Sequence, residues 1–299
     1  MSRTSPLQTK FYLAVAILSL LATTPAQQSP QKDNDIAFQE NVPYATIDGT
    51  ELHLDVYQPS DLGKQTRPAI ILIHGGGWVG FDKSTMRGMG QFLARSGFVA
   101  VAVDYRLFQN DKNRWPAQLD DVQRAVRWIR ANAAKYGVDA AHIGAFGHSA
   151  GGQLACLLGM EDTRDNSDPK LAKFSSQVQA VVDVSGPTDF TTHTDPEEVV
   201  FLTKFLGGDP TKHSDIWRDA SPAFRVSKTT VPFLIFHGTK DDSVPIAQSQ
   251  ELYDKLKSAG VPVTFTKVDD EHTFRTPEAR RQLAIDSRDF FFRYLAAQK

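Results

Sequence analysis

The chain has 299 residues, and its 33 lysines and arginines nearly balance its 35 aspartates and glutamates, giving a formal net charge of −2 at pH 7. A charge so close to zero argues against nucleic-acid binding through a broad basic surface. Hydrophobic residues make up 41% of the sequence and charged residues 23%, which argues against wholesale disorder. The single cysteine, Cys156, excludes an intrachain disulfide and a cysteine-rich zinc site, and its apolar neighbours indicate a buried side chain.

The N-terminal end has the order of a secretory signal peptide. An apolar run at 11–22 follows Lys10 and precedes Thr24 and Ala26, the small residues of a cleavage site. The run is shorter than the roughly 20 residues that cross a bilayer, so an uncleaved N-terminal anchor is the less favoured interpretation. We therefore predict a signal peptide over 1–26 and a mature protein that is secreted or periplasmic, with no stable membrane anchor after cleavage.

The predicted secondary structure begins after a polar lead-in over 27–42, which we expect to be loosely held. Alternation over 44–57 around Asp48-Gly49, a dipeptide that suits a tight turn, predicts an antiparallel hairpin. Apolar runs that are typical of buried strands follow at 69–73, 98–103, 142–146, 178–184, 233–236 and 261–268. Segments with helical periodicity occur at 86–96, 119–136, 150–159, 247–259 and 277–297.

This alternation of strands and helices predicts an α/β fold, with a mostly parallel central sheet and helices on both of its faces. No long or proline-rich linker divides the chain, so we expect a single domain over 43–299. The irregular segments 161–176 and 191–222 are expected to cross above the sheet. Ligands of open α/β sheets bind at the carboxyl ends of the strands, so catalytic motifs are expected there.

The sequence GHSAG at 147–151 lies between a predicted strand and a predicted helix. It fits the G-x-S-x-G nucleophile elbow, in which a serine projects from a sharp turn and the glycines let strand and helix approach each other. The start of a helix would also place the oxyanion near the positive end of the helix dipole. We predict Ser149 as a nucleophile; the alternative is a glycine-rich turn whose serine only caps the helix.

The sequence HGGGW at 74–78 directly follows a predicted strand. Consecutive glycines cost backbone entropy, but they let successive N–H groups approach one oxygen atom. Together with the N–H of Ala150, those of Gly76 and Gly77 are predicted to form an oxyanion hole. A phosphate-binding loop is the alternative, but neither G-x-x-x-x-G-K-[ST] nor a G-x-G-x-x-G that opens a helix is present.

Two later strand ends carry an acid and a histidine in the chain order of a serine hydrolase triad. Asp241 and Asp242 follow the strand at 233–236, and His272 follows the last strand. Of eight histidines, only His272 comes after both the serine and the acid at a late strand end, so we predict it as the general base. Neighbouring loop residues point in different directions, so only one of the two aspartates can face it. Loop-bonding roles are expected for His74, His148 and His237.

Five motifs resemble the α/β-hydrolase esterases of the hormone-sensitive-lipase-like group, most closely its BD-FAE subset, named for a bifunctional feruloyl and acetyl-xylan esterase. The motifs are HGGGW, VDYRL, PAxxxDVxxAVRWIRANA, GHSAGG and HGxxDxxVP, and the likeness runs over about 46–294. The resemblance implies that the aspartate of HGxxDxxVP, Asp241, is the acid of the triad. Glu271 and Thr273 stand where the family often has glycine, and YRLAPE of the lipase relatives reads YRLFQN, so the pocket wall is expected to differ.

These features predict a secreted serine carboxylic ester hydrolase that acts through an acyl-enzyme on a small-molecule or polysaccharide-linked ester. Acetyl or feruloyl esters of plant polysaccharide are the hypothesised substrates, because the short lead-in leaves no room for a helical cap over the cleft. No cofactor is expected, and no H-x-x-x-H or H-E-x-x-H supports a metal. A serine peptidase or lipase on the same fold remains an alternative, as does a non-catalytic binding protein. Trp78 and Trp115 belong either to the pocket or to the core.

Overall fold

An eight-stranded sheet runs through the part of the protein that the computed structural model describes, residues 35–296 without 62, 64 and 163–166. The strands lie in the order β1-β2-β4-β3-β5-β6-β7-β8. Their bounds are β1 Ile36–Ile47, β2 Thr50–Pro59, β3 Arg67–Ile73, β4 Val99–Val103, β5 Val138–His148, β6 Ala180–Val184, β7 Phe233–Gly238 and β8 Val263–Val268. The pairs β1–β2 and β2–β4 are antiparallel, and the pairs from β4 across to β8 are parallel. The predicted fold class is confirmed.

The N-terminal hairpin turns where the sequence predicted, but it begins earlier. Asp48 and Gly49 have φ values of 51° and 79°, as a tight two-residue turn requires. Residues 36–42 of the predicted lead-in are not loosely held, because they form the first half of β1 and pair with β2. Most of their side chains are at least partly exposed, so the partner strand fixes this segment without an apolar pattern. The predicted signal peptide over 1–26 lies outside the described residues.

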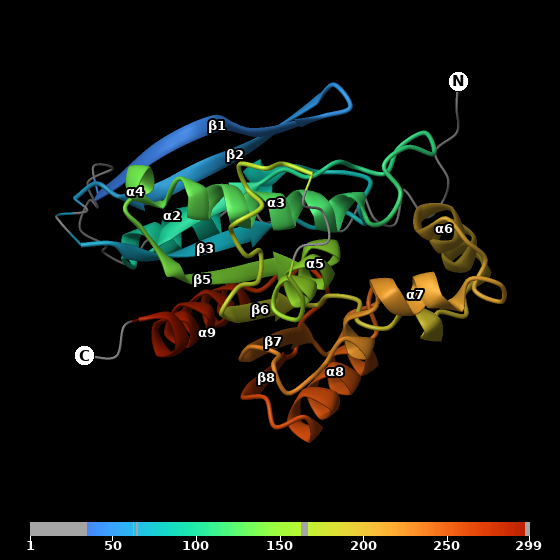
Figure 1. The fold of residues 1–299 in the computed structure, drawn as a ribbon. Helices are drawn as coiled ribbons and strands as arrows, with labels where there is room; N and C mark the ends of the chain where they lie inside the picture. The colour runs from blue at the N-terminus through green and yellow to red at the C-terminus, as the bar shows by residue number, and fades with distance from the viewer. Residues whose placement is uncertain (1–34, 62, 64, 163–166, 297–299) are drawn as a thin grey trace.

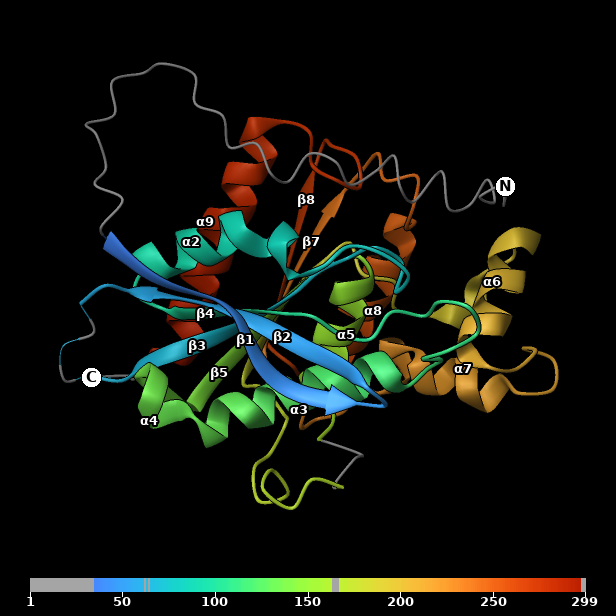
Figure 2. The ribbon, with the colours of Figure 1, turned by 90° about the horizontal axis from the view of Figure 1, so that it is seen from above.

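Helices cover both faces of the sheet (Figure 1, Figure 2): α2 and α9 pack on one face, and α3, α5 and α8 on the other. The helices are α2 Arg87–Arg95, α3 Ala117–Ala131, α4 Ala133–Tyr136, α5 Ala150–Leu158, α6 Pro196–Leu206, α7 Ser214–Ala220, α8 Ile246–Ser258 and α9 Pro277–Leu295. Short 3-10 turns are η2 Lys83–Met86, η3 Phe190–Thr192 and η4 Pro222–Phe224. The single helix predicted over 119–136 is interrupted at Asn132, where φ is −107° and ψ 15°. Of the helices described, none combines the length and apolarity that crossing a membrane requires.

The segment 191–222, predicted to be irregular, contains α6 and α7. The side chain of Asp195 accepts two backbone N–H groups of the first turn of α6, and Pro196 occupies its first position. Gly207 ends the helix in the left-handed region, with φ 88°. These start and stop signals are local. The prediction of an irregular segment rested on the alternation of strands and helices and did not use them. Figure 1 shows α6 and α7 beyond the carboxyl ends of the parallel strands.

The core consists of two hydrophobic layers, one on each face of the sheet. Along β3, Ile71 and Ile73 face the layer of α3 and α5, whereas Ile70 and Leu72 face that of α2 and α9. Strands buried on both faces read as continuous apolar runs, which is why the parallel strands were visible in the sequence. Cys156 on α5 is fully buried, as expected, and burial raises the pKa of its thiol well above the usual value.

Candidate active site

Ser149 occupies the turn between β5 and α5, at the carboxyl edge of the sheet. Its backbone has φ 56° and ψ −121°, a conformation that costs a non-glycine residue on the order of 1–3 kcal/mol. Its N–H donates to the carbonyl oxygen of Val184 on β6, at 2.8 Å, which anchors the turn against the neighbouring strand. The strained residue of the motif is therefore the serine itself.

The two glycines of the motif let three elements approach one another. A Cβ on Gly147 would overlap the carbonyl oxygen of Gly151, and a Cβ on Gly151 would overlap the carbonyl oxygen of Ile73 at the end of β3. No side chain fits at either position, so only glycine allows β3, β5 and α5 to come this close. Ser149 is thereby held at the start of α5, where the helix dipole favours negative charge.

The HGGGW loop lies directly against this elbow. A Cβ on Gly75 would lie only 3.2 Å from the Cβ of Ser149. Gly76 and Gly77 have φ values of 106° and 57°, in the region that favours glycine. The backbone N–H groups of Gly76, Gly77 and Ala150 have no acceptor among the described residues. All three therefore remain able to donate to an oxygen atom of a bound molecule.

Aromatic and amide side chains fix the HGGGW loop from outside. The rings of His74 and Tyr105 stack at 4.2 Å, with 8° between their planes. The Tyr105 hydroxyl donates to the carbonyl oxygens of His74 and Gly75, at 3.0 and 3.3 Å. At the other end of the loop, Nε1 of Trp78 donates to Oε1 of Gln153 on α5, at 3.1 Å. The loop is thus preorganised, which is what an effective oxyanion hole requires.

Asp241 is the acid that meets His272. Nδ1 of His272 lies 2.6 Å from Oδ2 of Asp241, whose side chain is fully buried. Asp242 is exposed, and its carboxylate accepts a hydrogen bond from the hydroxyl of Ser243 at 3.3 Å. The residues alone left open which of the two adjacent aspartates is the acid. In the fold, Asp241 is the one that faces the histidine.

Four donors surround the carboxylate of Asp241. Its Oδ2 faces His272 and, at 3.0 Å, Nε2 of His237, while its Oδ1 accepts the N–H groups of Ser243 and Val244 at 2.9 and 2.8 Å. Burial by itself would raise the pKa of Asp241, but the hydrogen bonds from His237 and His272 outweigh it and hold that pKa well below its usual range. The carboxylate is therefore ionised near neutral pH and keeps a proton on Nδ1 of His272.

Two more histidines fix loops at the site, as expected. Nε2 of His148 donates to the carbonyl oxygen of His272 at 2.9 Å, and because His148 directly precedes Ser149, this bond ties the His272 loop to the elbow. Burial, and then the nearby ring of His272, lower the pKa of His148 to about 4, so it stays neutral. Nε2 of His237 also contacts the carbonyl oxygen of Val244 at 2.9 Å, which closes the loop that carries the acid.

A cavity of about 40 Å³ opens beside Ser149. Its apolar wall consists of Trp78, Pro187, Phe190, Phe201, Leu202 and Val244. Polar side chains on the wall are those of His193, Glu198 and Ser243. Trp78 thus lines the cavity, whereas Trp115 is buried elsewhere and its Nε1 donates to Oδ2 of Asp219 at 3.2 Å.

Much of this wall comes from η3 and α6, which the sequence analysis did not connect with the site. Phe201 and Leu202 belong to α6, and His193 follows η3. No short motif marks such residues, because they reach the cavity through packing of the excursion above the sheet. The local signals are the helix start at Asp195-Pro196 and the stop at Gly207, which predict a helix but not where the helix lies.

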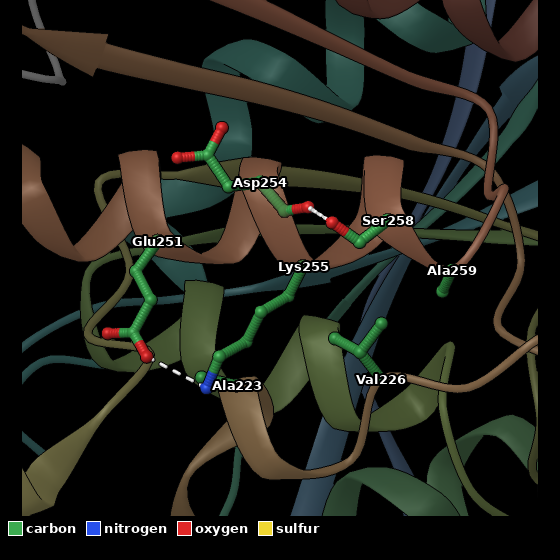
Figure 3. Close-up of a pocket in the computed structure, with 7 residues that line it drawn as sticks. All are labelled: Ala223, Val226, Glu251, Asp254, Lys255, Ser258 and Ala259. Atoms are coloured by element: carbon green, nitrogen blue, oxygen red, sulfur yellow. Dashed lines mark hydrogen bonds and ion pairs between the residues drawn. The ribbon is translucent and has the colours of Figure 1, made fainter.

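A second, larger hollow of about 690 Å³ lies along α8, and none of the predicted site residues lines it. Figure 3 shows two contacts of its polar side chains: Nζ of Lys255 contacts Oε1 of Glu251 at 2.8 Å, and the hydroxyl of Ser258 donates to the carbonyl oxygen of Asp254 at 2.8 Å. The carboxylate of Asp254 accepts a hydrogen bond from Nε2 of Gln250 at 3.0 Å. This hollow therefore offers no unpaired reactive group, and the cavity at Ser149 is the candidate active site.

The fold, the strained serine and the buried aspartate–histidine pair define an α/β-hydrolase. Solved esterase structures share this architecture. A truncated carbohydrate esterase from gut microbiota is 30% identical, with a TM-score of 0.74 over 89% of this chain and 99% of that chain. A thermophilic esterase from the planctomycete Thermogutta terrifontis, with butyrate bound, is 26% identical, with a TM-score of 0.75 over 87% of this chain and 96% of that chain.

The chain belongs to the BD-FAE family, whose family model matches residues 54–256. Esterase LipC of Mycobacterium tuberculosis is 33% identical over 212 residues, which are 69% of this chain and 52% of the relative. The probable carboxylic ester hydrolase LipM of the same organism is 31% identical over 243 residues, 79% of this chain and 54% of the relative. The chain spans about half the length of these curated relatives. The family resemblance seen in the sequence is confirmed.

Proposed function

We propose that this chain is a serine carboxylic ester hydrolase that works through an acyl-enzyme on Ser149. The observation that carries the proposal is the 2.6 Å hydrogen bond between Asp241 and His272, in a loop that His148 ties to the strained elbow. A base that a buried carboxylate orients, in a loop tied to the turn that carries the serine, is the arrangement that activates a hydroxyl for attack. The esterase names of the matched relatives and structures support the same activity.

In the first half of the reaction, Oγ of Ser149 attacks the ester carbonyl carbon and its proton passes to Nε2 of His272. Asp241 makes this possible because it keeps the other ring proton on Nδ1. The electron pair of the carbonyl moves onto its oxygen, and the N–H groups of Gly76, Gly77 and Ala150 stabilise that negative charge.

The tetrahedral intermediate then collapses. The bond to the alkoxy oxygen breaks, and the departing alcohol takes the proton from Nε2 of His272, which leaves the acyl group on Ser149. A water molecule repeats the sequence with the same base: its oxygen bonds to the acyl carbon, the bond to Oγ breaks, and Ser149 regains a proton. These steps need an ester and water and no cofactor.

The size of the cavity favours a short acyl group. A cavity of about 40 Å³ is far smaller than the roughly 300–1,000 Å³ of pockets that hold drug-sized ligands. An acetyl group fits that space, whereas a feruloyl group would have to extend outside it. The neighbouring structure with butyrate bound agrees with small acyl groups. Of the two hypothesised esters, we therefore propose acetyl.

Two parts of the proposal concern the whole protein. We propose that the enzyme is exported through the signal peptide over 1–26 and that its alcohol is a plant polysaccharide or a fragment of one. The likeness to a carbohydrate esterase from gut microbiota supports the second part. N-terminal sequencing of exported protein should give a mature start at Gln27; a start at Met1 would contradict export by cleavage. Release of acetate from acetylated xylan tests the substrate.

The activity itself is tested with p-nitrophenyl acetate. Ser149→Ala should lower kcat/KM by at least about 10⁴-fold, because the acyl-enzyme cannot form. Ser243→Ala, which removes the other serine of the cavity, is the matched control and should retain turnover within about tenfold. Equal turnover by Ser149→Ala and the wild type would refute the proposal. A p-nitroanilide peptide assayed alongside tests the peptidase alternative, for which we expect no turnover.

A further inference from the structure

His193 stands on the wall of the same cavity as Ser149 and is held in one orientation. Its Nδ1 lies 2.9 Å from Oε2 of Glu198 on α6. Its ring stacks on that of Phe190, with centroids 5.9 Å apart and 23° between the planes. A carboxylate and an aromatic face thus fix a ring that takes no part in the proposed triad.

The other ring nitrogen of His193 is left without a partner. Nε2 is buried, and it has no hydrogen-bond partner among the described residues. A buried polar atom left unpaired costs about 1–3 kcal/mol, so such atoms need an explanation. His193 is one of the residues that line the cavity, so the missing partner is sought in a bound substrate that reaches Nε2 from there.

The carboxylate of Glu198 determines what kind of partner that is. A carboxylate accepts hydrogen bonds, so it holds the ring proton of His193 on Nδ1. In the neutral ring Nε2 then carries a lone pair and acts as an acceptor. The group it can bind must donate a hydrogen bond, and in a simple ester the donor is a hydroxyl group.

We propose that Nε2 of His193 accepts a hydrogen bond from a free hydroxyl of the substrate, and that the enzyme therefore prefers hydroxyl-bearing esters. This inference rests on the proposed esterase function and narrows its substrate class. His193 binds substrate and takes no part in bond breaking. The hydroxyl belongs either to the acyl part, as in a hydroxy acid, or to the alcohol part, as in a partly acylated polyol.

Two matched pairs of esters distinguish these sources. On the alcohol side, 2-hydroxyethyl acetate is compared with 2-methoxyethyl acetate, in which a methyl group replaces the donor proton. On the acyl side, p-nitrophenyl 3-hydroxybutyrate is compared with p-nitrophenyl butyrate. The measured quantity is the ratio of kcat/KM within each pair, which cancels general effects on catalysis. In one pair, the wild type should prefer the hydroxyl member by about fivefold to tenfold, the size of one neutral hydrogen bond.

His193→Phe keeps an aromatic ring against Phe190 but removes Nε2. In the pair that shows the preference, the ratio of kcat/KM should therefore fall to about one. His193→Gln retains an oxygen that can accept, and it should keep part of the preference. His142→Phe is the control: His142 also pairs with a carboxylate, Asp139, at 2.8 Å, but it lies seven residues before Ser149 and is not among the residues that line the cavity. It should leave both ratios unchanged.

Two results would overturn the inference: a wild type that shows no preference in either pair, or a preference that His193→Phe retains in full. Labelling of Ser149 in His193→Phe by a fluorophosphonate probe shows that the variant is folded. If the wild type hydrolyses none of the four esters, the proposed esterase function fails as well. If it hydrolyses all four without preference, only the role of His193 fails.

Discussion

Two regions of the molecule meet at the cavity, and they differ in how the sequence encodes them. The loops at the ends of β3, β5, β7 and β8 carry the serine, the acid, the histidine and the candidate oxyanion donors. The excursion with η3 and α6 carries much of the wall of the cavity beside Ser149. In the first region the backbone adopts positive φ values and comes into close contact with neighbouring backbone, so glycine and serine occur at fixed short spacings. In the second, ordinary helical residues reach the cavity only through tertiary packing.

The largest effect is expected in the first region, where substitution of two adjacent carboxylates should change kcat/KM to very different extents. Asp241→Asn should lower kcat/KM by about 10⁴-fold, because an amide can hold His272 in the wrong tautomer. Asp242→Asn removes a neighbouring, exposed carboxylate and should change kcat/KM less than threefold. Steady-state kinetics on p-nitrophenyl acetate measure both. Similar losses in the two variants would contradict the assignment of the acid.

A glycine of the HGGGW loop should be nearly as sensitive. A Cβ on Gly76 would overlap the carbonyl oxygen of Gly80, so Gly76→Ala must shift the N–H groups of the loop. We expect kcat to fall by about 10²–10³-fold, the cost of losing one oxyanion donor. Gly49→Ala in the β1–β2 turn also strains a positive φ, but it has open space and lies far from the elbow in sequence. Gly49→Ala should lower the free energy of unfolding by about 1 kcal/mol and leave kcat unchanged. If kcat falls in Gly49→Ala as well, the effect of Gly76→Ala is not local to the HGGGW loop.

Beneath the elbow, Asp183 should make stability depend on pH. Burial raises the pKa of Asp183 to about 7, against smaller lowering effects of His237, the N–H of Gly186 and the thiol of Cys156. In the unfolded chain the carboxyl ionises near pH 4, so the folded state binds the extra proton between about pH 4 and 7. The contribution of Asp183 to the free energy of unfolding should therefore fall by roughly 3 kcal/mol as pH rises through this range. His148, whose pKa is lowered to about 4, makes a contribution of opposite sign below about pH 6.5, so the Asp183 contribution is measured as a difference between variant and wild type.

Asp183→Asn should remove this contribution, because the amide does not titrate, so the free energy of unfolding of the variant relative to the wild type should rise by roughly 3 kcal/mol over the range. Urea unfolding at pH 4.5 and pH 8 measures the difference. Asp269→Asn, which removes a carboxylate that is 78% exposed, is the control and should preserve the wild-type slope. An Asp183→Asn variant whose free energy of unfolding depends on pH in the same way as that of the wild type would contradict the raised pKa of Asp183.

The smallest effect is expected in the second region, where packing sets acyl length. Phe201→Ala enlarges the cavity. It should raise the ratio of kcat/KM for p-nitrophenyl hexanoate over acetate by about tenfold, because discrimination between apolar groups in a pocket amounts to a few kcal/mol or less. Val200→Ala truncates the adjacent residue of α6, which is 57% exposed, and should leave the ratio unchanged. If both variants or neither change the ratio, the acyl group does not bind against α6.

The same contrast explains what the sequence could and could not predict. Buried parallel strands and the glycines around Ser149 follow from local rules, and so the sheet, the elbow and the HGGGW loop were visible. The choice of Asp241 over Asp242 came from the family pattern, because loop direction is a tertiary property. The first half of β1 was missed because its partner strand, rather than an apolar pattern, fixes it. His193 was missed because only packing brings it to the cavity.

The central claim is that Ser149 is the nucleophile that His272 and Asp241 activate. The most direct measurement is peptide mapping by mass spectrometry after reaction with a fluorophosphonate probe. We predict one adduct, on Ser149, in the wild type, and far slower labelling of that serine in His272→Ala. An adduct on another residue, or labelling of Ser149 at the wild-type rate in His272→Ala, would contradict it.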